Sequence, residues 1–313
     1  MQVHFGVGEL AVEWPEAVVC IGTFDGVHRG HVAVIETAVR QAREAGLVAC
    51  LVTFDRHPAA ILAPERAPQL IAPLQENLRR FAECGLSATV VLPFDAELSR
   101  QSAERFFRDI LQDRLRARQI VVGHDFAMGN GREGTTDWLA ARIQTTVVSP
   151  FALDGERVSS SRIREAVELG DVARANRLLG RPFRFSGVVV HGQKLGRTLG
   201  YPTANLARSA PQVIPADGVY AGVAQTRFGE FQAAIGIGKR PTVNGANRTV
   251  EAFLLDFEWQ DLYGSSLDLD FVASIRPEAK FESLDELQSA MANDVRQARQ
   301  LLAELQPSGS AQR

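Results

Sequence analysis

The sequence has few of the features that mark secreted, disulfide-bonded or membrane-spanning proteins. It holds three cysteines among 313 residues, and no two of them form a Cys-x-x-Cys pair. Cys20 and Cys50 lie inside apolar runs, where a thiol behaves as a small buried hydrophobe. No apolar run approaches the roughly 18 residues of a membrane-spanning helix, and the first residues lack the pattern of a signal peptide. We therefore expect reduced thiols, a cytoplasmic location and no membrane partner.

The charge balance and the missing motifs exclude further classes. The formal net charge is −3, which argues against a nucleic-acid partner because such proteins usually carry a basic surface. The phosphate-loop motif GxxxxGK[ST] is absent. There is also no convincing Ser–His–Asp or Cys–His nucleophile. A small, locally basic phosphate pocket remains compatible with this composition.

The first half of the chain carries the alternating pattern of an α/β domain. Short Val-rich runs recur, and helical patterns lie between them. Runs without clean polar alternation are typical of strands that are covered on both faces. A last helical stretch over residues 161–180 ends at Gly180. The pattern predicts a doubly wound parallel sheet, in which ligands bind at the carboxyl ends of the strands. We expect strands at residues 17–22, 47–54, 88–94, 119–123 and 145–151.

The pattern changes to β structure from about residue 183 onward. Short apolar runs follow one another between glycines and prolines, with no helical pattern between them, which is typical of a small barrel. An amphipathic helix that begins at Ser283 comes last. The sequence therefore predicts an α/β domain over residues 1–182 and an all-β domain over residues 183–313, with β runs at 183–192, 218–226, 231–238, 249–257 and 267–275.

The stretch GTFDGVHRGH, residues 22–31, lies between the first predicted strand and the first helix. Its glycines permit a tight turn and the close approach of a ligand, and the N–H groups of a helix N-terminus favour a phosphate. His28 and His31 are three residues apart and can share one face of the first helical turn. Two surface histidines, or a metal pair near Asp25, are the alternative interpretations.

A second polar stretch, VSSSRIRE at residues 158–165, combines hydroxyls with two arginines. Its serines can cap a helix. Arg162 and Arg164 can present planar guanidinium groups to a phosphate at the start of that helix. An ordinary capped helix is the alternative interpretation.

Two features of the second half point to phosphate chemistry. The stretch GRTLGYPTANL, residues 196–206, places Thr203 and Asn205 two residues apart, and their oxygens suit Mg²⁺. Glu251 shares a predicted strand face with Phe253 and Leu255. A carboxylate on an apolar face is costly unless it has a task, such as accepting the proton of a hydroxyl group. An ordinary β-turn and a carboxylate at a wet rim are the alternatives.

These motifs together resemble one family. GTFDGVHRGH is similar to the GxFDGxHxGH signature of the nucleotidylyltransferase superfamily. With TFDRHP (53–58), VVGHDFAMGNGREG (121–134), RVSSSRIREA (157–166) and GRTLGYPTANL, the chain resembles the prokaryotic bifunctional riboflavin kinase/FAD synthetase family. The resemblance implies a Rossmann-like FMN adenylyltransferase domain and a six-stranded riboflavin kinase β-barrel with a C-terminal helix. It also implies that ATP phosphorylates riboflavin to FMN, and that FMN is adenylylated to FAD with release of pyrophosphate.

The resemblance further implies roles for single residues. The catalytic residues would be His28, His31 and Arg162 in the first domain and Glu251, as the base, in the second. In the first domain ATP would bind at Gly22, Phe24, Asp25, Gly26, His28, His31, Ser160, Ser161 and Arg162, and the flavin at His57, Asp125 and Phe126. In the second domain ATP would bind at Gly196, Gly200, Pro202, Thr203 and Asn205, Mg²⁺ at Thr203 and Asn205, and the flavin at Glu251, Arg276 and Phe281.

The chain departs from the family pattern mainly in the first domain. His124 stands where an acidic residue is common, Ala127, Met128 and Asn130 where aromatic and basic residues are common, Arg56 where a proline is common, and Pro277 where an Asp is more frequent. The alternative functions are therefore a riboflavin kinase with an impaired adenylyltransferase half, or a flavin-binding regulator without turnover. Expected partners are riboflavin, FMN, FAD and ATP, and any homo-oligomer is expected to be weak.

Overall fold

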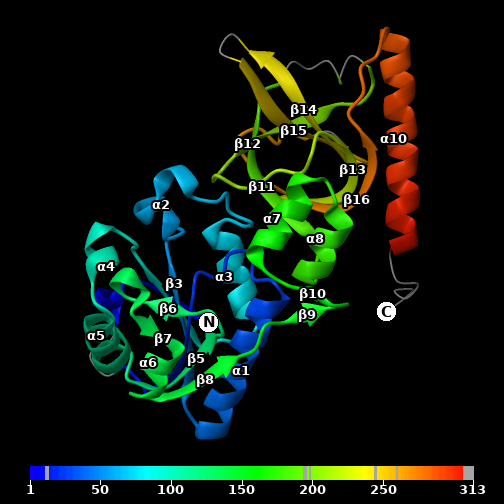
Figure 1. Ribbon diagram of the computed structural model, residues 1–313. Helices are drawn as coiled ribbons and strands as arrows, with labels where there is room; N and C mark the ends of the chain where they lie inside the picture. The colour runs from blue at the N-terminus through cyan, green and yellow to red at the C-terminus, as the bar shows by residue number, and fades with distance from the viewer. Residues whose placement is uncertain (11–13, 193–195, 197–198, 243–244, 259, 306–313) are drawn as a thin grey trace. The chain divides into compact units, whose positions relative to one another are not determined.

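The computed structural model describes residues 1–10, 14–192, 196, 199–242, 245–258 and 260–305. The chain divides into two compact units, Met1–Ser160 and Ser161–Arg313, and Figure 1 shows the elements of both. No helix within the described ranges has the length and apolar character needed to cross a membrane.

The first unit is built on a six-stranded sheet in which every pairing is parallel, so the predicted doubly wound sheet is confirmed. The five predicted strands are present. A sixth, β1, lies at one edge and has no apolar run that could reveal it. In spatial order the strands are β1 (Gln2–Phe5), β4 (Ala88–Leu92), β3 (Val48–Phe54), β2 (Ala17–Ile21), β5 (Ala117–Gly123) and β8 (Gln144–Val148).

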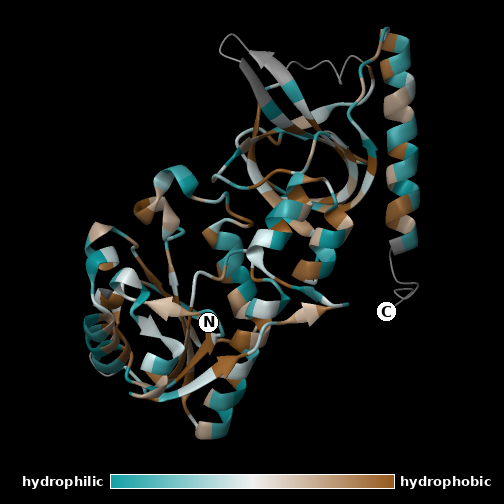
Figure 2. Ribbon diagram, viewed as in Figure 1, coloured by the Kyte–Doolittle hydropathy of each residue, from teal (hydrophilic) through white to brown (hydrophobic). Residues whose placement is uncertain are grey.

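Helices cover both faces of this sheet because its central strands are apolar on both sides (Figure 2). On one face, Val18 and Cys20 of β2 pack in a cluster with Ile35 of α1 and Phe81 of α3. On the other face, Val19 of β2 belongs to a cluster with residues from the segments after β4 and β5. The helices of this unit are α1 (Arg29–Ala45), α2 (Ala59–Leu62), α3 (Leu74–Glu83), α4 (Ala96–Arg100), α5 (Ala103–Phe106), a π-helix that continues α5 (Phe107–Arg114), and α6 (Thr136–Ala140), with 3-10 turns at Val7–Glu9, Pro64–Arg66 and Asn130–Arg132.

Two short hairpins complete the first unit. One pairs β6 (Ala127–Met128) with β7 (Gly134–Thr135), and the other pairs β9 (Ala152–Leu153) with β10 (Glu156–Arg157). The first hairpin follows the carboxyl end of β5. This is the edge of a parallel sheet at which ligands bind.

The second unit contains a closed antiparallel barrel, which confirms the predicted six-stranded barrel. Phe183, Phe185 and Phe271 are fully buried. The barrel also includes a strand at Thr203–Arg208, in the stretch for which an ordinary β-turn is the alternative interpretation. In spatial order the strands are β11 (Phe183–Val190), β12 (Thr203–Arg208), β15 (Gly245–Leu254), β14 (Gly229–Thr242), β13 (Gly218–Thr226) and β16 (Ser266–Pro277).

The described residues of this part of the chain also form helices. The helical stretch predicted over residues 161–180 consists of α7 (Ser160–Glu168) and α8 (Val172–Leu179), because Gly170 adopts a left-handed conformation and Asp171 caps a new helix. The long last helix, α10 (Leu284–Leu305), packs against the barrel through Ala298 and Leu302.

Candidate active sites

The first candidate site is the loop between β2 and α1, and buried side chains hold its backbone in place. The Asp25 carboxylate is 4% exposed and accepts hydrogen bonds from the N–H groups of Ile71 (3.0 Å) and Ala72 (3.3 Å). The Gly26 N–H donates to Asn77 Oδ1 at 3.1 Å. Asp25 therefore holds the loop in place, and the described residues contain no group of three or more His, Cys, Asp or Glu side chains that could hold a metal ion.

The conformation of this loop is strained, as is common at functional sites. Phe24, Gly26 and Val27 all have positive φ values, of 47°, 78° and 40°. Residues other than glycine rarely adopt this backbone conformation. This backbone leads directly into the N-terminus of α1.

His28 and His31 lie together at the start of α1, as their spacing predicts. His28 is the N-cap, and its Nδ1 accepts a hydrogen bond from the His31 N–H at 3.2 Å. The two rings stack with their centroids 3.5 Å apart, and Phe24 packs edge-on against His31 at 5.3 Å. Because His28 Nδ1 accepts the bond from the His31 N–H, the His28 ring in this arrangement can donate a hydrogen bond only from Nε2. A phosphate bound here would also meet the partial positive charge of the helix N-terminus.

Ser160, the last residue of the first unit, donates from its hydroxyl to the Asp25 carbonyl oxygen at 3.4 Å. Ser161 and Arg162 follow it in the chain and belong to the second compact unit. The Arg162 guanidinium forms an ion pair with Glu165, one turn further along α7, at 3.1 Å.

A cavity of about 730 Å³ opens beside this loop and brings together residues from three motifs. Its lining includes Gly22, Phe24, His31, His57, Asp125 and Phe126 of the predicted set, whereas Asp25, Gly26, His28, Ser160, Ser161 and Arg162 do not line it. The sequence pattern missed its aromatic walls, Phe54, Phe94 and Phe106, which lie in or near apolar runs that indicated only strand and helix cores.

Three of the family departures, Ala127, Met128 and Asn130, line this cavity, and His124 precedes the lining residue Asp125, whereas Arg56 and Pro277 do not line it. Arg157 Nη2 contacts both His124 Nε2 (3.0 Å) and the Asp125 carboxylate (3.1 Å), so the imidazole takes a place beside Arg157 that an acidic residue would also suit. Ala127 and Met128 form β6, and the buried Met128 joins the core under the sheet. The Asn130 N–H donates to the Gln101 carbonyl oxygen at 2.9 Å.

The second candidate site lies in the barrel, where β12 and β15 pair. Thr203 Oγ1 donates to Glu251 Oε2 at 3.0 Å, and Asn205 is the register partner of Glu251. Asn205 is 8% exposed. Hydroxyl, amide and carboxylate oxygens thus lie on two adjacent strands, and this donor set suits Mg²⁺, which prefers oxygen ligands.

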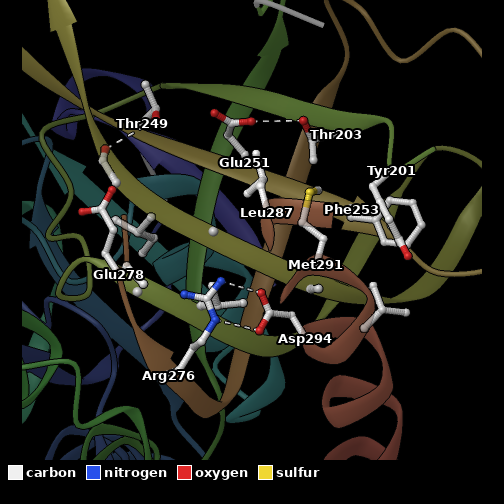
Figure 3. A pocket seen from close by; sticks show the side chains of 18 of the residues that line it. Tyr201, Thr203, Thr249, Glu251, Phe253, Arg276, Glu278, Leu287, Met291 and Asp294 are labelled. Carbon is white, nitrogen blue, oxygen red and sulfur yellow. Dashed lines mark hydrogen bonds and ion pairs between the residues drawn. The ribbon is translucent and has the colours of Figure 1, made fainter. Parts of the chain in front are cut away.

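A cavity of about 350 Å³ in the barrel holds Thr203 and Glu251 on one wall (Figure 3). Tyr201 and Phe253 provide aromatic surface, and Leu287 and Met291 contribute from α10. The predicted flavin residues Arg276 and Phe281 line the same cavity, with the Arg276 guanidinium 5.5 Å from the centre of the Phe281 ring.

Alternate residues of the same segment line a second, smaller cavity of about 250 Å³. Its lining includes Gly200, Pro202 and Ala204 of this segment, together with Leu254 and Asp256. Successive side chains of a strand point to opposite faces, so Thr203 faces the larger cavity while its neighbours face the smaller one. The sequence pattern did not indicate that Leu254, Asp256 and Phe257 line this smaller cavity.

Gly196 closes the loop that precedes this strand. Its carbonyl oxygen accepts hydrogen bonds from the N–H groups of Leu199 and Tyr201, and a Cβ at this position would lie 2.3 Å from the Tyr201 carbonyl oxygen. Arg197 and Thr198 of the same motif lie outside the described residues.

Comparisons with known proteins agree with this two-site arrangement. A family model described as FAD synthetase matches residues 11–162, and one described as riboflavin kinase matches residues 179–302. A bifunctional riboflavin kinase/FMN adenylyltransferase of Escherichia coli K12 is 38% identical over 300 residues, which cover 93% of this chain and 94% of that protein. The enzyme of the same name from Bacillus subtilis 168 is 34% identical over 294 residues, or 91% and 92% of the two chains.

A solved structure has the same fold over nearly the whole length. It is a crystal structure from Streptococcus pneumoniae described as a macrolide-efflux protein, with a TM-score of 0.87 and 30% sequence identity. The match covers 96% of this chain and 99% of that one.

Proposed function

Because this chain belongs to the bifunctional riboflavin kinase/FMN adenylyltransferase family, it makes FMN from riboflavin and FAD from FMN, and we propose how its residues divide the two reactions. The proposal assigns adenylylation to residues 1–182 and the kinase reaction to residues 183–313. The ranges of the two family matches, 11–162 and 179–302, support this division.

The kinase reaction needs a base because the hydroxyl of riboflavin is not acidic. The 5′-hydroxyl oxygen of riboflavin bonds to the γ-phosphorus of ATP while the bond from that phosphorus to ADP breaks. Glu251 accepts the proton that this hydroxyl loses. The hydrogen bond of 3.0 Å from Thr203 supports this role, since it orients the carboxylate at the cavity wall. The flavin ring occupies the larger cavity beside Phe253, Arg276 and Phe281.

The nucleotide of the kinase reaction lies against the other face of β12. Gly196, Gly200 and Pro202 shape the loop around this nucleotide. The smaller cavity has apolar walls, such as Leu254 and Phe257, that suit the adenine base of ATP. Thr203 and Asn205 would hold Mg²⁺ through their side-chain oxygens. When bound, the ion neutralises charge on the transferred phosphate.

Adenylylation needs no base, because the attacking phosphate of FMN is already ionised near neutral pH. Its oxygen bonds to the α-phosphorus of ATP while the bond from that phosphorus to pyrophosphate breaks. His28, His31 and the N–H groups at the start of α1 donate hydrogen bonds to the phosphates. Ser160, Ser161 and Arg162 add hydroxyls and a cation, and Gly22, Phe24, Asp25 and Gly26 shape the loop. The flavin lies in the first cavity beside His57, Asp125 and Phe126.

The observation that carries the kinase proposal is the hydrogen bond between Thr203 and Glu251 in the barrel. The variant Glu251→Gln tests whether Glu251 is the base. The substitution keeps the shape of the side chain and removes its basicity. We expect riboflavin phosphorylation to fall by about 10²–10⁴-fold, with adenylylation of added FMN unchanged. Product chromatography after mixing protein, ATP and Mg²⁺ with either flavin measures both rates.

Two further variants complete this experiment. Glu230→Gln, on the outer hairpin of the same barrel, is the matched control and should leave both rates unchanged, since Glu230 contacts Gln225 outside the cavity. His31→Ala should slow adenylylation and spare the kinase. Loss of both reactions in Glu251→Gln would refute the division, and FMN accumulation without FAD in the wild type would favour an impaired first domain.

A further inference from the structure

An ion pair between the barrel and the last helix forms part of the kinase cavity (Figure 3). Arg276, near the end of β16, donates from Nε to Asp294 Oδ1 at 2.8 Å and from Nη2 to Asp294 Oδ2 at 2.7 Å. Asp294 lies on α10 and is 4% exposed. The pair is therefore a bidentate contact with a buried carboxylate, a geometry that fixes the plane of the guanidinium.

The remaining contacts of Arg276 complete its orientation. Nη1 donates to the Pro277 carbonyl oxygen at 3.1 Å, and the guanidinium lies 5.5 Å from the Phe281 ring centre. A guanidinium has five N–H donors. The described contacts occupy three of them, so two can face a ligand in the cavity.

Asp294 also lies at the boundary between the anchored and the exposed parts of α10. The helix is attached to the barrel through Ala298 and Leu302, both buried against barrel residues. Toward its N-terminus, Leu287 and Met291 line the cavity and are only partly buried. Asp294 is thus a buried polar anchor next to the segment of the helix that forms the cavity wall.

We propose that Asp294 is a positioning residue for riboflavin: it orients the Arg276 guanidinium toward the flavin and holds the Leu287–Met291 wall against the cavity. This inference rests on the proposed assignment of the larger cavity to the flavin. The hydroxyl–carboxylate centre at Thr203 and Glu251 does not include Asp294, so Asp294 acts on flavin binding and not on the chemical step.

The test is Asp294→Asn, which keeps the shape of the side chain and removes its charge. The free energy of a charge-assisted hydrogen bond corresponds to a change in affinity of about tenfold or more. We expect the KM for riboflavin, and its Kd from quenching of flavin fluorescence, to rise by about tenfold. The KM for ATP, the kcat of the kinase and FMN adenylylation should stay within about twofold of the wild type.

Arg276→Lys and Arg299→Gln are the companion variants. A lysine keeps the charge but cannot make the forked contact, so Arg276→Lys should raise the riboflavin KM to a similar extent. Arg299 forms a second bidentate pair between α10 and the barrel, with Asp256 at 2.6 and 2.7 Å, but Arg299 does not line the flavin cavity. Arg299→Gln should therefore leave the riboflavin KM unchanged.

The double variant Arg276→Met, Asp294→Leu separates orientation from packing. An apolar pair of similar volume can replace a buried ion pair without loss of stability, so α10 stays attached while the oriented cation is lost. We expect the riboflavin KM of this variant to stay raised by about tenfold or more, and a return to the wild-type value would overturn the inference.

The outcomes distinguish this inference from the proposed function. If Arg276→Lys raises the riboflavin KM and Asp294→Asn does not, the positioning role is wrong and the flavin site stands. If neither variant changes flavin affinity, the assignment of the cavity itself is wrong. A uniform loss of melting temperature, kcat and both KM values in Asp294→Asn would reduce Asp294 to a structural residue and would also overturn the inference.

Discussion

Gly26→Ala tests whether the geometry of the β2–α1 loop is as restricted as the structure indicates. Gly26 has φ = 78°, and a Cβ built there would lie 2.5 Å from Ile71 Cγ2 and 2.8 Å from Ile71 Cβ. Ile71 cannot move away easily, because it is 1% exposed and its N–H is held by the Asp25 carboxylate at 3.0 Å.

Two costs add up in this variant. A left-handed conformation costs an alanine about 1–2 kcal/mol relative to glycine, and overpacking of a well-filled core costs about 1–3 kcal/mol. The first unit should therefore lose about 2–5 kcal/mol of unfolding free energy. Gly46→Ala at the end of α1 is the matched control, because Gly46 has φ = 67° with no atom within 4 Å of its Cβ position, and it should lose only about 1–2 kcal/mol.

Urea unfolding followed by tryptophan fluorescence measures the difference, since Trp14 and Trp138 belong to the first unit. Under conditions where both variants are folded, Gly26→Ala should slow FMN adenylylation and leave riboflavin phosphorylation unchanged, because the loop leads directly into the helix N-terminus that carries His28 and His31. If Gly26→Ala is no less stable than Gly46→Ala, the contact with Ile71 is not a real restriction and the reasoning fails.

Two further predictions concern titrating groups. The Asp55 carboxyl is partly buried, which raises its pKa, but hydrogen bonds from Arg56 and from the Phe94 N–H outweigh this and keep the pKa below its usual value. Asp55 therefore stabilises the fold above about pH 4, and this contribution is lost as the pH falls further. In urea titrations, the unfolding free energy of the wild type should exceed that of Asp55→Asn by an amount that shrinks between about pH 5 and pH 3. A difference that stays constant over this pH range would contradict the prediction. Burial raises the pKa of the Cys20 thiol well above its usual value and that of Cys50 to about 12, so a thiol reagent should modify Cys84 first, and prompt labelling of all three thiols in the folded protein would contradict this.

The fold could be predicted largely because strong local patterns determine it. Strands covered on both faces, such as β2 and β3, leave continuous apolar runs that stand out from the amphipathic helices between them. The errors fall where local pattern and tertiary structure disagree. Strand β1 is exposed at the sheet edge, and β12 starts in a motif whose proline and polar residues favour a turn.

The candidate sites could be predicted only as far as short motifs reach. His28 and His31 are neighbours through helical spacing, and Thr203 and Asn205 through strand spacing. Partners that are distant in the sequence left no such signal. Asn77 holds Gly26 from 51 residues away, and Asp294 reaches Arg276 across 18 residues, and only the folded chain brings them together.

The two cavities differ in a way that matches the acidity of the two attacking groups. The described residues that line the kinase cavity include the carboxylates of Glu251, Glu278 and Asp294, and Asp294 is neutralised by Arg276. In the first cavity the described lining includes one carboxylate, Asp125, which is paired with Arg157. A hydroxyl must lose a proton to attack phosphorus and a phosphate oxygen need not. The Thr203 hydroxyl fixes the position of the Glu251 carboxylate, which is the group proposed to accept that proton in the kinase reaction.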